Sequence, residues 1–250
     1  AIWWVPRYVD ETALETRQTY YTTSLSVREY LPTAQTGLDA ITNPESTVDD
    51  VAGSIPVVAE LESRSFTMGE AMTEPLPSLP PLVPSGPIDE LAPLRDQGAI
   101  LATASSDVAR RLGHAYVYRT SVPRLMDTGP LPIAATTQEI NEISVRLASS
   151  LAEDSAIVAD LPEDPAFAEV LVATRANLDW YADWQDRYLT ALTGEDSSTA
   201  ADAVDEIEVR RTELTALNES ALLGFRVDAD AAIVTLAGEF DRYLVEVSSP

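Results

Sequence analysis

The sequence has no cysteine and no lysine, and its only histidine is His114. Without cysteine, the chain forms no disulfide framework, thiolate nucleophile or cysteine-ligated metal site. Without lysine, it has neither a Schiff-base nucleophile nor the cation of a phosphate-binding P-loop. A single histidine cannot supply a histidine-based metal site or an H-E-x-x-H zinc helix. We therefore expect no metal centre and no cofactor.

Familiar catalytic motifs are absent as well. The patterns G-x-S-x-G and G-x-G-x-x-G do not occur, and the surroundings of His114, RRLGHAYVYR, lack the strand-to-helix elbow of a nucleophilic serine. Neighbouring carboxylates such as Glu153 and Asp154 point to different faces of a helix, so they form no acid/base couple. Asp228 and Asp230 resemble the start of a calcium loop without its glycine and distal glutamate. We expect that the protein is not an enzyme, because an enzyme would need an imported cofactor or carboxylates alone.

The charge is strongly one-sided. There are 41 acidic residues against 16 arginines, which gives a net charge of −25. Two explanations for the missing lysine stay open: GC-rich codon usage, which replaces lysine codons by arginine codons, and adaptation to high salt, which screens the repulsion within a carboxylate-rich surface. Either way, the field of the protein repels polyanions, so we expect no binding to nucleic acid. Residues 136–250 hold 24 of the acids and seven of the arginines, a net charge of −17.

Apolar side chains recur with helical spacing along most of the chain. The clearest helix has Asp164 as its N-cap, Pro165 at its first position and Gly194 at its end. Its apolar stripe advances by alternating steps of four and three residues, through Phe167, Leu171, Thr174, Leu178, Tyr181, Gln185, Tyr188 and Leu192. We expect the aromatic residues Trp180, Tyr181, Trp184 and Tyr188 to pack in a helix seam, with a ligand box as the alternative.

Further helices are expected on both sides of this one. In the C-terminal half, Thr136 and Glu139 form a capping-box pair, Ser197 or Ser198 begins another helix, and Asp228 begins a last one. Gly224 either separates these last two helices or bends one long rod. In the N-terminal half we expect helices over about 10–30, ending near Pro32, over 48–72, kinked or restarted at Pro56, and over about 101–120.

Residues 73–87, TEPLPSLPPLVPSGP, are too rich in proline for a helix or a central strand. A polyproline II segment is the physical expectation, either as a ligand for an aromatic groove or as a rigid connector along the helices. The predicted fold is an all-α, elongated antiparallel helical bundle with a proline-rich extended connector, because helices of about 25 residues are about 38 Å long. We expect one helical domain over 1–250, with sub-regions 1–72, 73–87 and 88–250.

One stretch of the chain runs against the acidic trend. No acid occurs between Asp107 and Asp127. The candidate binding residues in and around this stretch are Arg110, Arg111, His114, Tyr116, Tyr118, Arg119 and Arg124. Guanidinium and phenol groups suit a small anionic ligand or an acidic protein partner. The structural alternative is that these arginines bridge to the acidic helices. Asn218 and Ser220 also form one N-x-S sequon.

The first residues, AIWWVPRYVDE, place two tryptophans before a proline and an acidic helix. Tryptophan is enriched where hydrocarbon meets lipid headgroups, so Trp3 and Trp4 are predicted to be membrane-proximal, next to an anchor upstream of this chain. The alternative is that they pack into the bundle. We expect an extracellular or cell-surface, membrane-tethered module for protein interaction or scaffolding, with a homo-oligomer as one arrangement. A ligand-binding sensory input bundle of a membrane receptor and a cytoplasmic location stay open.

Overall fold

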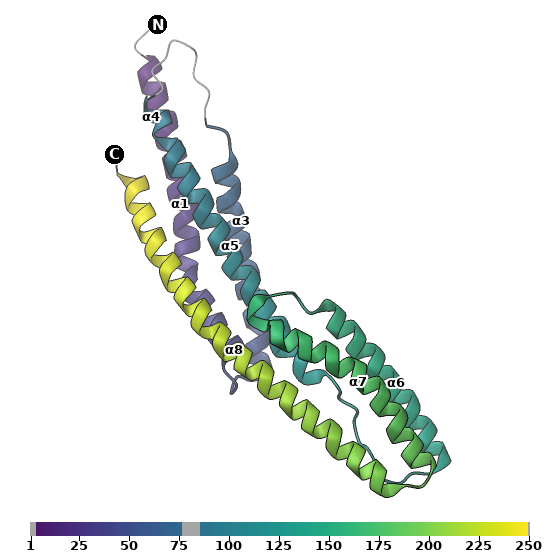
Figure 1. The fold of residues 1–250 in the computed structure, drawn as a ribbon. Coiled ribbons are helices and arrows are strands. Elements are labelled where there is room, and N and C mark those ends of the chain that lie inside the picture. Colours follow the sequence, from purple (N-terminus) through teal and green to yellow (C-terminus); the bar gives the residue numbers. More distant parts are fainter. Residues whose placement is uncertain (1–3, 77–85, 250) are drawn as a thin grey trace. The chain divides into compact units, whose positions relative to one another are not determined.

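The structure is a computed structural model that describes residues 4–76 and 86–249. All regular structure in these two ranges is helical, which confirms the all-α class (Figure 1). The elements are α1 (Trp4–Thr42), α2 (Val48–Ala52), α3 (Ser54–Thr73), α4 (Gly86–Asp89), α5 (Leu91–Ser121), the 3₁₀ turn η1 (Val122–Arg124), α6 (Thr137–Asp160), the 3₁₀ turn η2 (Pro165–Phe167), α7 (Ala168–Thr193) and α8 (Ser197–Ser248). Trp3 and residues 77–85 of the expected proline-rich connector lie outside the described residues, as do the surroundings of the Trp4 side chain.

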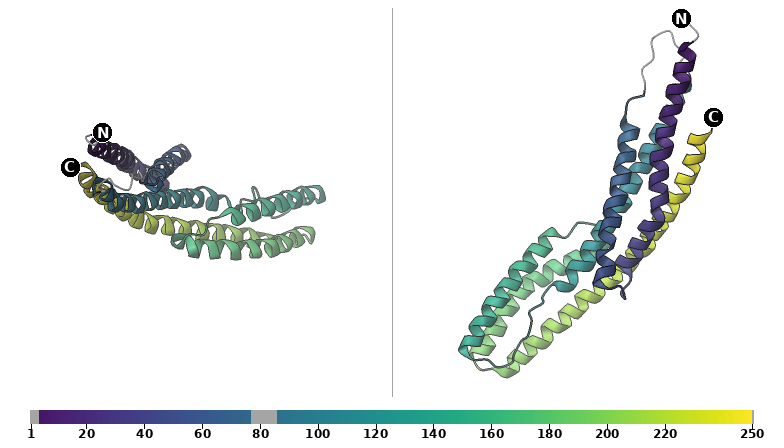
Figure 2. Two further views of the ribbon diagram at one scale, coloured as in Figure 1. Left: turned by 90° about the horizontal axis from the view of Figure 1, so that it is seen from above. Right: turned by 180° about the vertical axis from the view of Figure 1, so that it is seen from behind.

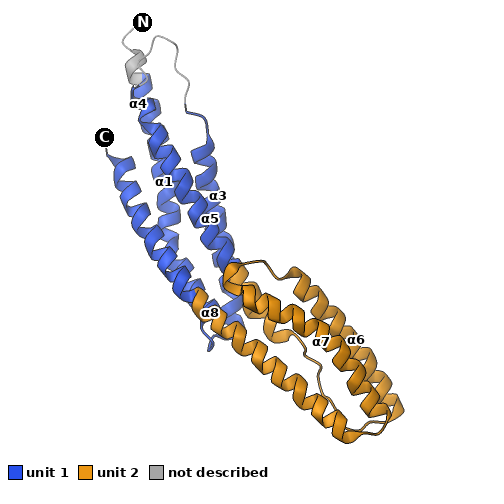
Figure 3. Ribbon diagram, in the orientation of Figure 1, with its two compact units in different colours: residues 1–113, 226–250 blue, residues 114–225 orange. Residues whose placement is uncertain are grey.

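The chain divides into two compact units (Figure 3). Unit 1 comprises residues 1–113 and 226–250, and unit 2 comprises residues 114–225. The unit boundaries therefore fall inside α5 and α8. The expected single domain with sub-regions 1–72, 73–87 and 88–250 stays a prediction.

In unit 1, α1, α3, the first part of α5 and the last part of α8 lie side by side (Figure 2). The buried side chains of α1 advance by the same steps of four and three residues as those predicted for α7, through Val27, Leu31, Ala34, Leu38 and Ile41. Gly37 lets α3 approach closely, because a Cβ at this position would lie 3.1 Å from Cγ1 of Val57. Two ion pairs join α1 to α8, from Arg28 to Asp241 and from Arg226 to Asp39.

Two predicted helix boundaries in unit 1 need correction. The helix expected to end near Pro32 continues to Thr42, with Pro32 inside it. A proline in a helix costs about 3 kcal/mol, but the buried side chains on both sides of Pro32 bind α1 into the core and outweigh that cost. The expected break near Pro56 lies at Gly53, between α2 and α3. Pro56 falls in the first turn of α3, where its missing N–H has no partner to lose.

In unit 2, the predicted helix boundaries hold best. The Thr136 side chain accepts a hydrogen bond from Glu139 N–H, and Glu139 bonds back to Thr136, so the capping box begins α6. The Asp164 side chain accepts from Ala166 N–H, and Gly194 caps the end of α7. One detail differs, since the first turn after Asp164 is the 3₁₀ turn η2. Within unit 2, α6 packs on α7.

The last helix of the chain is longer than expected. α8 is a single helix of 52 residues, so Gly224 does not separate two helices and Asp228 begins none. A glycine inside a helix costs about 1 kcal/mol, which the buried Leu222 and Phe225 on either side of Gly224 offset. The N-cap is Asp196 and not Ser197 or Ser198, because the Asp196 carboxylate accepts from Thr199 N–H.

Candidate functional site

The predicted arginine and tyrosine cluster is divided between the units. Arg110 and Arg111 belong to unit 1, whereas His114, Tyr116, Tyr118, Arg119 and Arg124 belong to unit 2. Arg110 is exposed and pairs with Asp107 on its own helix, at 2.6 Å. Arg124 is exposed in η1, and Tyr116 and Arg119 are half-buried on α5. Use of these residues for ligand or partner binding therefore stays a prediction.

Two members of the cluster hold the chain that precedes α7. Tyr118 is fully buried, its hydroxyl donates to the Pro162 carbonyl at 2.9 Å, and its ring stacks on Phe167 with 4.3 Å between ring centroids. Burial raises the pKa of the Tyr118 hydroxyl to about 12. Nδ1 of His114 lies 3.1 Å from Oδ2 of Asp164, whose carboxylate also caps η2. These polar atoms are used inside unit 2, which leaves them poorly placed for an outside ligand.

Three of the four aromatic residues of the α7 stripe are core, as expected, whereas Trp180 is half-buried and donates to the Glu206 carboxylate at 3.1 Å. Trp184 stacks between Tyr181 and Tyr188, at centroid distances of 5.5 and 5.3 Å, and all three side chains are buried. Each polar atom has a partner: Trp184 donates to the Ala203 carbonyl, Tyr188 to the Pro132 carbonyl and Tyr181 to the Ser150 hydroxyl. This arrangement fixes the seam of unit 2 and is not a ligand box.

Sequence reasoning missed a buried acid. Asp154 on α6 is only 4 % exposed, and its Oδ2 accepts a 2.8 Å hydrogen bond from Met126 N–H. Burial raises the pKa of the Asp154 carboxyl to about 6, the Met126 hydrogen bond opposes that rise, and the nearby Glu153 and Asp127 add to it. The signal was present in the spacing, since Asp154 follows the buried Leu147 by seven residues.

The sequon asparagine is also part of the core. Asn218 is 1 % exposed, and its Nδ2 donates to the Tyr118 carbonyl at 3.2 Å. Its Oδ1 has no hydrogen-bond partner in the structure. An enzyme that glycosylates asparagine needs access to this amide nitrogen, so Asn218 is not an acceptor in the folded protein.

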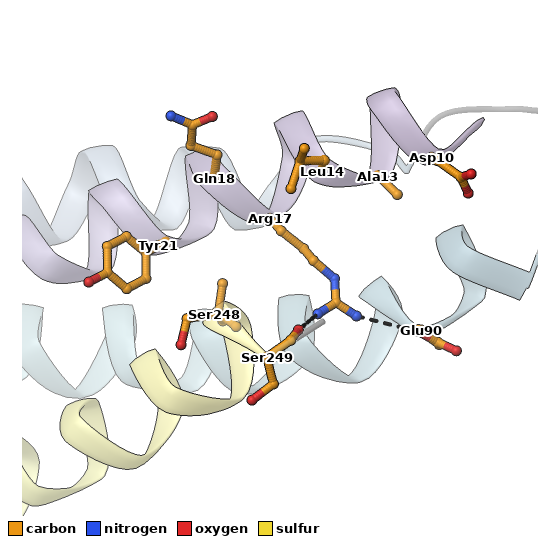
Figure 4. A pocket seen from close by; sticks show the side chains of 10 residues that line it. Asp10, Ala13, Leu14, Arg17, Gln18, Tyr21, Glu90, Ser248 and Ser249 are labelled. Atoms are coloured by element: carbon orange, nitrogen blue, oxygen red, sulfur yellow. Dashed lines mark hydrogen bonds and ion pairs between the residues drawn. The ribbon is translucent and has the colours of Figure 1, made fainter. Parts of the chain in front are cut away.

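A groove lies at the end of unit 1 where α1 begins and α8 ends (Figure 4). It has a volume of about 640 Å³, and Ala13, Leu14 and Val247 give it an apolar lining. Arg17 of α1 donates to the Ser249 carbonyl at the end of α8 and pairs with Glu90 at 3.4 Å. This positive side chain complements the negative end of the α8 dipole. The volume falls in the range of small-molecule pockets.

This groove is suited to binding a ligand and not to catalysis, because its lining offers apolar surface and a few charged groups. Asp10 also lines the groove, and the Glu90 carboxylate is the ion-pair partner of Arg17. Leu14 is 65 % exposed, which is a large apolar surface for a side chain at the rim of a groove. Among residues 4–76 and 86–249, no group of three or more side chains is arranged to hold a metal ion. In the same ranges, none of the helices contains eighteen residues apolar enough to cross a membrane.

No protein-family model matches the chain, and no significant match was found among curated proteins or among solved structures. The site is therefore interpreted from its own residues.

Proposed function

We propose that the chain is a non-enzymatic, membrane-tethered helical module on the outside of the cell that serves protein interaction or scaffolding. The observation that carries this proposal is the meeting of α1 and α8 at one end of unit 1, where Arg17 donates to the Ser249 carbonyl. An anchor upstream of Trp3 and Trp4 would hold the module by that end. The helical surface beyond it would then stay free for a partner.

The finer features of the fold belong to this proposal. They are an elongated antiparallel arrangement of the helices and an extended connector over residues 73–87. The net charge of −25 supports a surface role as well, because a strongly charged surface stays hydrated and resists non-specific association.

A sensory input bundle is the second candidate, and the same junction favours it. In a receptor with one membrane span on each side of its input module, the first and last residues of that module must lie at the same end of the fold, facing the membrane. The first turns of α1 and the last turn of α8 meet this requirement (Figures 1 and 2). The ligand would be a small anion, as predicted from the arginine-rich stretch of the sequence.

The tether is tested on the full gene product in its own cells. Residues 1–250 contain no cysteine, so one introduced at the exposed Ser220, by Ser220→Cys, gives this module a label site, and labelling is measured relative to the unsubstituted gene product. We expect the protein to sediment with membranes and to react with a membrane-impermeant maleimide on intact cells. The matched control is Ala109→Cys, at a buried position that should react only after unfolding. Labelling of Ser220→Cys only after lysis, or recovery in the soluble fraction, would refute the proposal.

The sensory candidate is tested by thermal stabilisation. Acetate, citrate, sulfate and phosphate are added to the purified chain and to its Arg110→Ala and Arg119→Ala variants. A rise in Tm that either substitution abolishes supports the receptor candidate. If none of the anions changes the Tm of the wild-type chain, the receptor candidate is refuted.

A further inference from the structure

The last part of α8 carries apolar side chains on two opposite faces. One face is buried in unit 1 and repeats by steps of four and three residues, through Ala229, Ile233, Leu236, Phe240, Tyr243 and Val247. The other face points to solvent. On it, Val227, Val234 and Val245 are 68 %, 64 % and 65 % exposed. Single exposed apolar residues are common on protein surfaces, and the notable feature here is that three valines share one face of one helix.

The exposed valines form one continuous stripe. They are separated by seven and eleven residues, which are close to two and three whole helical turns. Ala231 and Gly238, both exposed, fill the same face between them. A Cβ placed on Gly238 would meet no atom within 4 Å, so the space in front of this glycine is open. We call these five residues the α8 stripe.

Small and β-branched residues at such spacing suit the close approach of another helix. A stripe repeating at seven and eleven residues fits the seam of two packed helices, and a glycine in the seam lets the two backbones approach. Knobs from the partner helix would enter the gap between Val234 and Val245. The stripe is therefore complementary to a rod and not to a small molecule.

The charges beside the stripe select the partner. Asp230 precedes Val234 by four residues and Asp241 precedes Val245 by four, so each carboxylate lies one turn from a valine. Arg242, three residues before Val245, is the cation on this part of the helix, and its Nε donates to the Gly238 carbonyl at 3.4 Å. Arg28 pairs with Asp241 at 2.8 Å, while Asp230 is exposed. A second copy of the chain would bring another −25 of charge to the contact, with acids facing acids.

We infer that the α8 stripe docks an amphipathic helix of a partner protein whose apolar seam is flanked by arginine or lysine. This inference rests on the proposed interaction function and names the chemistry of its partner. Burial of the three valines supplies the attraction, and the cationic flanks of the partner set its register and orientation against Asp230 and Asp241.

The test uses the 250-residue chain and three synthetic helical peptides labelled with a fluorophore. The first has an alanine and valine seam flanked by arginine, the second has the same seam flanked by glutamate, and the third has the arginine peptide's composition in scrambled order. Binding is measured by fluorescence anisotropy. We expect saturable binding of the first peptide, at least tenfold weaker binding of the other two, and a dissociation constant that rises with salt.

Matched variants locate the binding. Val234→Asp places a charge in the stripe, and Val172→Asp makes the same change at a 67 % exposed valine of α7 in unit 2. Both positions are exposed, and circular dichroism checks that both variants keep the helical spectrum. We expect Val234→Asp to weaken binding of the arginine peptide at least tenfold, although it adds a negative charge, and Val172→Asp to change it less than twofold.

Three results would overturn the inference: equal binding of the arginine and glutamate peptides, equal effects of the two substitutions, or a wild-type dimer that Val234→Asp converts to a monomer. The last result would make a second copy the occupant. Membrane sedimentation and surface labelling test the tether separately, so failure of the docking inference is distinguishable from failure of the proposed function.

Discussion

Asp154→Asn is expected to stabilise the protein at neutral pH. The folded chain raises the pKa of this buried carboxyl from 3.8 to about 6, a difference of about 2 units. Each unit corresponds to about 1.4 kcal/mol, so the ionised carboxylate costs the folded state up to about 3 kcal/mol above pH 6. Asparagine has nearly the same shape, and its Oδ1 can still accept from Met126 N–H. It carries no charge, although its bond to Met126 is weaker than one to a carboxylate. We expect a net gain of about 1–2 kcal/mol at pH 7.5.

The sign of the pH dependence follows from the raised pKa. Because the folded state holds this proton more tightly, the contribution of Asp154 to stability is fully present below about pH 4 and is lost as the pH rises through about 6. The asparagine variant has no such loss. The difference in unfolding free energy between variant and wild type should therefore grow by about 2–3 kcal/mol from pH 4 to pH 7.5.

Guanidinium unfolding at several pH values, followed by circular dichroism, measures this difference. Asp160→Asn, at an exposed position of the same helix, is the matched control and should leave stability within about 0.5 kcal/mol of wild type at each pH. A stability difference for Asp154→Asn that does not change with pH would refute the reasoning. So would a variant that is less stable than wild type at pH 7.5.

Three further predictions concern packing and salt. Gly98→Ala should destabilise the protein by about 1–3 kcal/mol in chemical unfolding, because the added Cβ would lie 2.6 Å from Sδ of Met72 and 2.7 Å from the Tyr243 hydroxyl. Its control, Gly238→Ala, has open space around the added Cβ and should be neutral or stabilising by up to about 1 kcal/mol. Equal effects of the two substitutions on stability would contradict the packing argument. Pro32→Ala should raise the free energy of unfolding by about 1–3 kcal/mol by restoring a helix N–H inside α1, and a loss of stability would mean that the proline is favourable where it stands. If salt adaptation explains the missing lysine, Tm should climb steeply into molar KCl, whereas a flat response leaves codon usage as the explanation.

The elements that could be predicted from sequence are those whose signals are local. In α7, the spacing of apolar residues, the Asp164 cap and the Gly194 stop all agree, and the structure follows them. Local signals misled where packing overrode them. The sequence predicts a helix end near Pro32, but α1 continues past this proline because its side chains on both sides are buried. Asp228 reads as a cap in the sequence but lies in the middle of α8.

The candidate sites depend on residues that are far apart in sequence. The groove joins Arg17 to Ser249, which are 232 residues apart, and no sequence pattern links these positions. The burial of Asp154 likewise depends on the turn at Met126. The α8 stripe was readable in principle, because its valines share one helical face. A sequence alone does not tell which of two apolar faces of a helix is the buried one.

The discontinuous composition of unit 1 has a consequence during synthesis. Residues 1–113 leave the ribosome well before residues 226–250, and the bond between Arg28 and Asp241 closes a loop of 213 residues. Until the last helix emerges, the apolar faces of the first helices have no final cover, while unit 2 is continuous in sequence and can condense earlier. A folded unit 2 shortens the flexible chain that must be closed. The nascent protein is thus most exposed to chaperones and proteases in the interval between completion of residue 113 and arrival of the carboxyl-terminal helix.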